Sequence, residues 1–209
     1  MRLADLVLTR ADVAWATEGK GLIATSNKLG YTVGQRFEGY GVCKALAKGK
    51  AKPKQKSAKA QAKAQQAISE GDALHKLVEH GNVPAVADWL EQIASDCVQE
   101  VFVSSNKLNI LGFADGLCQL KASSGMAVYE LKTSAWPDLE QFSHANEYAI
   151  ANHAKQLAMY CLLIAEMYGL PTYEGYLLYL HQHTGELKVL HFAQADIAKW
   201  LQACYTILR

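Results

Sequence analysis

Residues 112–132 read Gly-Phe-Ala-Asp-Gly-Leu-Cys-Gln-Leu-Lys-Ala-Ser-Ser-Gly-Met-Ala-Val-Tyr-Glu-Leu-Lys, and they predict two short β-strands around a Ser-Ser-Gly turn. Side chains alternate faces along a strand, so Glu130 and Lys132 share one face while Leu131 turns into the core. If the hairpin folds near the start of this turn, Asp115 falls almost opposite Glu130. The stretch therefore brings two carboxylates and an ammonium to one edge of a sheet.

This group of side chains has two interpretations. Acidic and basic residues on neighbouring strands commonly form cross-strand ion pairs on a solvated face. Two carboxylates beside a lysine also suit a hard divalent cation with a phosphodiester next to it, because Mg²⁺ prefers oxygen ligands and leaves positions open for water and phosphate. The segments on either side of the hairpin favour the second interpretation.

A helix upstream of the hairpin carries a candidate metal ligand. The apolar pattern of residues 69–81 predicts a helix that starts near Gly71 and ends at Gly81. His75 would lie one turn into this helix. A histidine on an amphipathic helix is by default a core or surface residue, and its place shortly before the hairpin makes His75 a candidate.

A second helix follows the hairpin and carries polar side chains. Residues 151–169 predict a long helix that ends at Gly169. Gln156 and Tyr160 are four residues apart, so they lie on one face of it. By default they would be a rim glutamine and a core tyrosine whose hydroxyl reaches water. The histidines other than His75 are expected to be ordinary core or surface residues.

The chain resembles the RecB-type branch of the PD-(D/E)xK nuclease superfamily in the order and spacing of four motifs, which are His75, Gly-Phe-Ala-Asp115, Glu130-Leu-Lys132 and Gln156-x-x-x-Tyr160. The resemblance covers roughly residues 66–182. That branch includes the RecB and AddB nuclease domains, the CRISPR-associated four-cysteine exonucleases, and the mitochondrial genome maintenance exonuclease with its phage relatives. Each motif alone is weak, and the four in order are specific.

The resemblance implies a role for each motif. It implies a site for Mg²⁺ or Mn²⁺ whose ligands are His75, Asp115, Glu130 and the backbone carbonyl of Leu131. An imidazole ligand makes Mn²⁺ a good match, because imidazole is softer than carboxylate. Beside the catalytic carboxylates, Lys132 would position or activate the attacking water, and Gln156 and Tyr160 would orient the site and the DNA backbone.

The order of predicted elements gives the fold class. Helices come first, then three or four strands, a helix, a hairpin and a closing helix, which suits an α/β (α+β) fold with a restriction-endonuclease-like central mixed sheet flanked by helices. We expect residues 1–209 to form a single nuclease domain. The predicted ranges are a helix over 83–98 that starts at Pro84, strands over 99–104 and 108–112, a hairpin over 174–193 and a helix over 194–208.

A lysine-rich segment stands out in an otherwise acidic chain. Residues 39–69 contain eight lysines and no acidic residue, so a net charge of +1 hides a charge of −7 on the rest. Such a run is usually a solvated loop, but beside a phosphodiesterase site it favours a mobile arm that binds the DNA backbone. The candidate DNA contacts are Lys50, Lys52, Lys54, Lys56, Lys59 and Lys63.

Several classes of protein are excluded by composition. Five widely spaced cysteines without a C-x-x-C pair argue against zinc modules and a disulfide framework. The CRISPR-associated relatives hold an iron–sulfur cluster with three late cysteines, and Cys204 alone lies near this C-terminus, so we expect no cluster. Charges interrupt the N-terminal apolar run and no stretch approaches the roughly 20 residues of a membrane span. We therefore expect no membrane partner and a cytoplasmic location in a bacterial or phage-infected host cell.

Three functional hypotheses follow. The first is a metal-dependent DNA exonuclease of replication, recombination or repair, whose minimal size is typical of phage enzymes. Its partners would be single-stranded DNA or DNA ends, and a recombination or replication protein. The second is a structure-specific endonuclease or resolvase of the same superfamily. The third is a catalytically inactive nucleic-acid-binding protein, against which the intact set of charged motifs argues.

Overall fold

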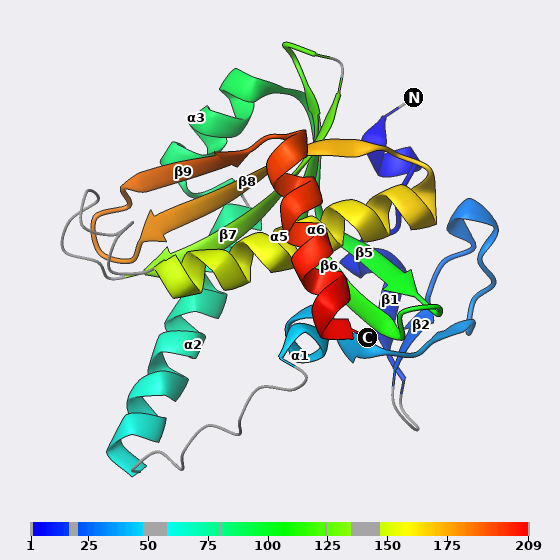
Figure 1. The fold of residues 1–209 in the computed structure, drawn as a ribbon, viewed down its shortest axis with the longest axis horizontal. Coiled ribbons are helices and arrows are strands. Elements are labelled where there is room, and N and C mark those ends of the chain that lie inside the picture. Colours follow the sequence, from blue (N-terminus) through cyan, green and yellow to red (C-terminus); the bar gives the residue numbers. More distant parts are fainter. Residues whose placement is uncertain are drawn as a thin grey trace.

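A six-stranded mixed sheet forms the centre of the structure, with helices on both of its faces (Figure 1). The structure is a computed structural model that describes residues 2–16, 21–47, 58–79, 81–123, 125–134 and 147–208. The strand order is β4-β6-β7-β8-β9, and β5 pairs with β6. β7 and β8 are parallel, while β5, β6 and β7 form an antiparallel run. The predicted fold class, a central mixed sheet flanked by helices, is confirmed.

The elements have the following bounds. The strands of the main sheet are β4 (Tyr40–Gly41), β5 (Ala94–Ser105), β6 (Ile110–Leu120), β7 (Met126–Ser134), β8 (Thr172–His181) and β9 (Leu187–Phe192). The helices are α1 (Val42–Leu46), α2 (Ala58–Glu79), α3 (Pro84–Ile93), α5 (Glu147–Tyr168) and α6 (Gln194–Leu208). A three-stranded sheet contains β1 (Val13–Trp15), β2 (Leu22–Ala24) and β3 (Arg36–Phe37), with short 3₁₀ turns at Leu3–Asp5, Arg10–Asp12 and Lys28–Gly30.

The hairpin of β6 and β7 has the predicted register. Gly116 pairs with Tyr129, so the next position along the hairpin places Asp115 opposite Glu130. Gly116 lies under the Tyr129 ring, and a Cβ there would come within 2.1 Å of ring atom Cε1. Only glycine fits at this position, and the hairpin is fixed next to the two carboxylates.

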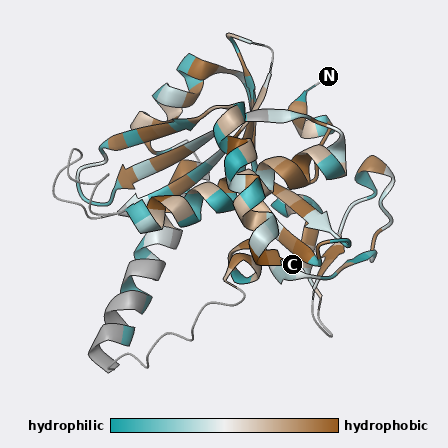
Figure 2. Ribbon diagram, in the orientation of Figure 1, coloured by the Kyte–Doolittle hydropathy of each residue, from teal (hydrophilic) through white to brown (hydrophobic). Residues whose placement is uncertain are grey.

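Helix α5 is the main cover of one face of the sheet. It packs against β5, β7 and β8, and its inner residues, including Leu157 and Leu163, are fully buried. Figure 2 shows hydrophobic residues along the central strands and on α5. The helix ends where Gly169 takes φ 65, as predicted. Because α5 connects the parallel strands β7 and β8, it must cross the sheet next to the hairpin.

Helix α2 differs from the predicted helix at its start. It runs without a break from Ala58 to Glu79, so it does not begin near Gly71, and His75 lies near its C-terminal end. The preceding Ala-, Lys- and Gln-rich residues are good helix formers, and one interior glycine costs only about 1 kcal/mol. The predicted end at Gly81 is confirmed, since Gly81 has φ 69 and its N–H donates to Val78 O.

The helix predicted over residues 83–98 is too long. α3 ends at Ile93 and β5 begins at Ala94. Ladder pairing of β5 with β6 continues to the end of β6 and overrides the amphipathic pattern that had suggested helix. The predicted strand pair is confirmed and extended, as are the C-terminal hairpin of β8 with β9 and the closing helix α6.

One cysteine pair forms a disulfide, which the argument against a disulfide framework did not anticipate. Cys97 on β5 lies directly opposite Cys118 on β6, with a Cα–Cα distance of 4.2 Å, and the two form a disulfide. Because the pair is 21 residues apart and joined only by strand register, spacing along the chain could not reveal it. The expectation that the chain holds no iron–sulfur cluster stays a prediction.

Two further expectations concern the lysine segment and membranes. Lys50, Lys52, Lys54 and Lys56 lie outside the described residues, as do the side chains of Lys59 and Lys63. Within the part of the chain that is described, no helix has the length and apolar character that a membrane crossing requires.

Candidate active site

Each carboxylate of the hairpin accepts a hydrogen bond from a backbone N–H group of the other strand. The N–H of Asp115 donates to Glu130 Oε1 at 3.3 Å, and the N–H of Leu131 donates to Asp115 Oδ2 at 2.6 Å. Ladder pairing of β6 with β7 stops at Gly116, so the carboxylates bond to backbone N–H groups just beyond it. The Glu130 side chain is only 1% exposed, and the Leu131 side chain is buried in the opposite core as predicted. Both carboxylates are thereby fixed without help from a ligand.

Lys132 forms an ion pair with Glu130, and its single positive charge lies beside two carboxyl groups. Its Nζ lies 2.7 Å from Glu130 Oε2, with 19% of the side chain exposed. Burial and the nearby Asp115 raise the pKa of Glu130 to about 8, despite the opposing effect of Lys132. Burial disfavours the Lys132 ammonium, but attraction to Glu130 and Asp115 outweighs it and raises the Lys132 pKa. Among the described side chains, ionisation of both carboxyl groups beside one ammonium would leave an excess negative charge in a low-dielectric site, which is why Glu130 holds its proton near neutral pH.

The alternation of side chains between the two faces of the sheet is interrupted at Asp115. Residues three apart in a regular strand face opposite sides, yet two such pairs share the core under α5, namely Val98 with Val101 on β5 and Ala114 with Leu117 on β6. The register places Glu100 opposite Asp115 at this point, and Glu100 takes φ 52. The Glu100 side chain forms an ion pair with Arg10. Positive φ in a non-glycine strand residue is strained, and such strain clusters at functional sites.

Gln156 and Tyr160 of α5 lie together on one helix face, as their spacing predicted, and that face meets the hairpin. Tyr160 is 5% exposed, and burial raises its pKa well above the usual range, while the Gln156 side chain hydrogen-bonds its hydroxyl. Gly112 on β6 leaves room for this tyrosine, since a Cβ there would lie 3.2 Å from its hydroxyl oxygen. The phenol and the amide therefore stand over the same face of the hairpin.

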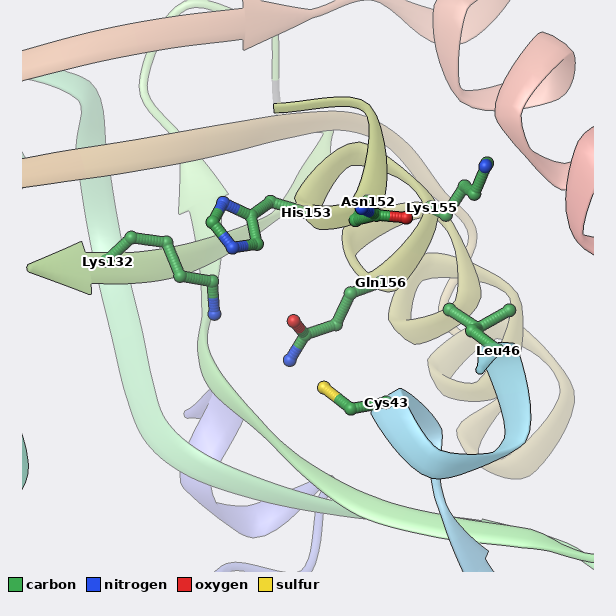
Figure 3. A pocket seen from close by; sticks show the side chains of 7 residues that line it. All are labelled: Cys43, Leu46, Lys132, Asn152, His153, Lys155 and Gln156. Carbon is green, nitrogen blue, oxygen red and sulfur yellow. The ribbon is translucent and has the colours of Figure 1, made fainter. Parts of the chain in front are cut away.

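A pocket of about 410 Å³ opens beside Lys132 (Figure 3). Its lining residues are Cys43, Leu46, Lys132, Asn152, His153, Lys155 and Gln156. In Figure 3 the Lys132 ammonium, the Gln156 amide, the His153 ring and the Cys43 sulfur converge on it. Two residues expected from sequence, Lys132 and Gln156, thus share a cavity with residues that sequence reasoning did not select.

His153 is the most important residue that the sequence analysis missed. It was grouped with the ordinary histidines, yet its Nδ1 lies 2.9 Å from the Tyr179 hydroxyl and its ring faces the pocket. Burial and the charge of Lys132 lower its pKa to about 4, so the imidazole is neutral near pH 7. A signal existed in the spacing, because His153 lies three residues before Gln156 and seven before Tyr160 on one helix face.

Cys43 had no comparable signal. It lies on α1, which packs against α5, and its thiol points into the pocket in Figure 3. Burial raises its pKa, so it is a thiol and not a reactive thiolate at neutral pH. Only the packing of a short N-terminal helix against α5 brings residue 43 to this place.

Helix α2 packs on β7 from the sheet face opposite Glu130 and Lys132. A Cβ at Gly71 would lie 3.1 Å from Thr133 Oγ1, and Val78 of α2 packs in the same core as Leu131. The His75 side chain is outside the described residues. Among side chains that are described, no group of three His, Cys, Asp or Glu forms a metal cage. Asp115 and Glu130 nevertheless fit a hard cation, because they offer carboxylate oxygens and an excess negative charge.

Comparisons with known proteins give only distant likenesses. No protein-family model matches the chain, and no curated protein does. The crystal structure of SSO0001 is 19% identical with a TM-score of 0.39, covering 71% of this chain, which spans 63% of SSO0001. The crystal structure of a "Putative exonuclease" from Eubacterium rectale is 11% identical with a TM-score of 0.45, covering 82% of this chain and 80% of that one. At these values neither likeness carries an argument about function, which rests on the site itself.

Proposed function

We propose that this chain is a metal-dependent deoxyribonuclease of the PD-(D/E)xK superfamily, an exonuclease that acts on DNA in replication, recombination or repair. One observation carries the proposal. Asp115 and Glu130 are held together by backbone hydrogen bonds, with an excess negative charge beside the Lys132 ammonium. Two carboxyl groups beside one ammonium offer oxygen ligands to a cation and a positive charge to a phosphodiester next to it.

The proposed metal is Mg²⁺ or Mn²⁺. Asp115 and Glu130 would hold it, with the Leu131 carbonyl and the His75 imidazole as the further ligands that the sequence resemblance suggests. When bound, the ion would supply a Lewis acid for a phosphate oxygen and lower the pKa of a water. The raised pKa of Glu130 agrees with this assignment, because a proton in the free protein neutralises the charge that a cation would neutralise in the loaded one.

Lys132 is the proposed electrostatic catalyst. Its raised pKa keeps the ammonium charged at physiological pH, and its bond to Glu130 fixes the position of that charge. An ammonium fixed beside the scissile phosphate would stabilise the charge that develops on the phosphate oxygens. Gln156 reaches the same pocket, so its amide can hold the DNA backbone while Tyr160 fixes the amide.

The lysine-rich segment is the proposed DNA-binding arm. Its support is charge, since residues 39–69 have eight lysines and no acid. The helix that follows it, α2, packs on β7, the strand that carries Glu130 and Lys132. A recombination or replication protein remains a proposed partner for which the described surface offers no particular argument.

The test uses end-labelled linear DNA, single- and double-stranded, together with closed circular DNA. Each substrate is incubated with Mg²⁺, with Mn²⁺ and with a chelator. We expect metal-dependent release of nucleotides from linear DNA only, and loss of this activity in Asp115→Asn and Glu130→Gln. The matched controls are Asp88→Asn and Glu166→Gln, which change exposed carboxylates on α3 and α5. Cleavage of circles would favour the endonuclease alternative, and binding without any cleavage would contradict a nuclease.

A further inference from the structure

The pocket beside Lys132 has the chemistry of a site for an anion attached to an apolar group. Among the described residues that line it, two are lysines and none is acidic. Asn152, His153 and Gln156 add polar groups from α5, while Leu46 and Cys43 of α1 form a less polar wall. Its volume of about 410 Å³ lies in the range of small-ligand pockets, about 300–1,000 Å³. A nucleotide, with a phosphate and a sugar, matches both walls.

The position of the pocket limits what can occupy it. Lys132 and Gln156 belong both to the pocket and to the candidate site, and the Lys132 ammonium is only 2.7 Å from Glu130. A strand whose phosphate lies at the carboxylates must therefore place a neighbouring nucleotide in or over this pocket. Lys155 lines the edge of the pocket, and in Figure 3 its amine points away from Lys132 and Gln156, with Nζ 5.9 Å from the centroid of the Trp200 ring.

His153 has a hydrogen-bonding arrangement that an anion would complete. Its Nδ1 is engaged by the Tyr179 hydroxyl, and the other ring nitrogen turns toward Lys132 and Gln156 in Figure 3. The phenol keeps its proton, because burial raises the pKa of Tyr179. When the phenol donates to Nδ1, the imidazole proton resides on Nε2 and can be donated to a phosphate oxygen. An anionic ligand thus selects a tautomer in which both ring nitrogens are bonded.

We propose that this pocket binds the nucleotide adjoining the scissile phosphate, and that His153 donates a hydrogen bond from Nε2 to that nucleotide's own phosphate. The inference rests on the proposed nuclease function and adds to it a subsite and a binding residue. His153 acts as a neutral donor supported by Tyr179, and Lys132 supplies the charge. The apolar wall of Leu46 and Cys43 contacts the sugar.

The test is binding without cleavage. Wild-type protein in chelator is titrated by calorimetry with deoxynucleoside monophosphates, with inorganic phosphate and with a nucleoside. We expect the monophosphates to bind more tightly than either part alone. His153→Ala should weaken them at least about tenfold, and His153→Gln, which retains an N–H donor, should stay within about threefold of wild type. His183→Gln, an exposed histidine on the β8–β9 turn, is the matched control and should change nothing.

A second measurement needs no variant to fold correctly. In ¹⁵N spectra of the wild type, monophosphate binding should give His153 a protonated Nε2 and a hydrogen-bonded, unprotonated Nδ1. Unchanged His153 signals, or equal affinity in His153→Ala, would overturn the proposal. If wild type cleaves DNA but binds no monophosphate, the subsite is refuted and the nuclease stands. If monophosphate binds through His153 but DNA is not cleaved with either metal, the proposed function is refuted and the subsite with it.

Discussion

Two neighbouring regions of the molecule handle charge in different ways. The hairpin cluster, which is Asp115, Glu130 and Lys132, is interlocked by backbone and ion-pair bonds, and Glu130 is 1% exposed. The α5 wall, which is Asn152, His153, Lys155 and Gln156, lines a pocket with half-buried side chains. Removing one member of the hairpin cluster leaves another charge buried without compensation. Where a side chain of the α5 wall is removed, water can enter the pocket and take its place. We therefore expect the hairpin cluster to control catalysis and the α5 wall to control binding.

The largest expected effect comes from neutralising either carboxylate of the hairpin cluster. Asp115→Asn and Glu130→Gln should reduce cleavage by about a thousandfold or more, equivalent to about 4 kcal/mol of barrier, while DNA binding changes little. Single-turnover cleavage and a DNA-binding titration measure the two quantities. Comparable losses in Asp88→Asn or Glu166→Gln, or full activity in both site variants, would show that the site is misassigned.

Lys132 should come next. Lys132→Ala should lower kcat by about a hundredfold to a thousandfold with metal binding retained, because its charge acts mainly on the transition state. Lys107→Ala, in the exposed β5–β6 turn, is the control. Calorimetric titration with Mn²⁺ measures metal binding. Loss of metal binding as complete as in Asp115→Asn would make Lys132 part of the metal site and remove the distinction between the two roles.

The two regions should also affect stability in opposite directions as pH changes. In metal-free protein the pKa of Glu130 is raised from 4.5 to about 8, so its stabilising contribution is full below about pH 4.5 and is lost as pH rises toward 8. The pKa of His153 is lowered from 6.5 to about 4, so its contribution is full above about pH 6.5 and is lost as pH falls toward 4.

Urea denaturation in chelator from pH 4 to 9 measures both contributions. Glu130→Gln should flatten the decline in unfolding free energy between about pH 4.5 and 8, and His153→Gln the rise between about pH 4 and 6.5. Added Mg²⁺ should stabilise the wild type more strongly as pH rises to about 8, since the metal must displace the Glu130 proton. The same slope in wild type and Glu130→Gln would contradict a buried excess charge.

A smaller effect should follow from the contact between the two regions. Gln156→Ala and Tyr160→Phe each remove a partner of one hydrogen bond and should lower kcat/KM by about fivefold, which corresponds to about 1 kcal/mol. Gly112→Ala should act similarly by displacing the Tyr160 ring, whose hydroxyl would lie 3.2 Å from the new Cβ. Steady-state kinetics on linear DNA would show this, and additive losses in Gly112→Ala/Tyr160→Phe would argue against a shared mechanism.

The smallest effect on turnover should come from the lysine segment. Replacing Lys50, Lys52, Lys54 and Lys56 with Gln should leave cleavage of saturating short oligonucleotides unchanged. The dependence of log affinity on log salt should become shallower by up to about 3, at about 0.7 per lost phosphate contact on single strands. Processivity on long DNA should fall, because the arm no longer holds the strand. Unchanged salt dependence would identify the segment as a solvated loop.

Local sequence determined the hairpin and most of its chemistry. Period-two alternation and a tight turn fix which residues of β6 and β7 face each other, so the pairing of Asp115 with Glu130 follows from residues within one hairpin. The spacing of Gln156 and Tyr160 follows in the same way from the helical period, and the glycine ends of α2 and α5 follow from positive φ. These features depend on backbone geometry over a few residues.

Long-range contacts decided the rest. The pairing of β5 with β6 decides where α3 ends, at Ile93, and brings Cys97 to Cys118. Helix α2 starts well before Gly71, which shows that a single glycine is a weak signal for the start of a helix. The pocket requires α1, β7 and α5 to meet, and no sequence period encodes that meeting. His153 could therefore be recognised as a site residue only from its contact with Tyr179 and its closeness to Lys132. Sequence periodicity fixes which way a side chain points, while packing between distant elements decides what that side chain meets.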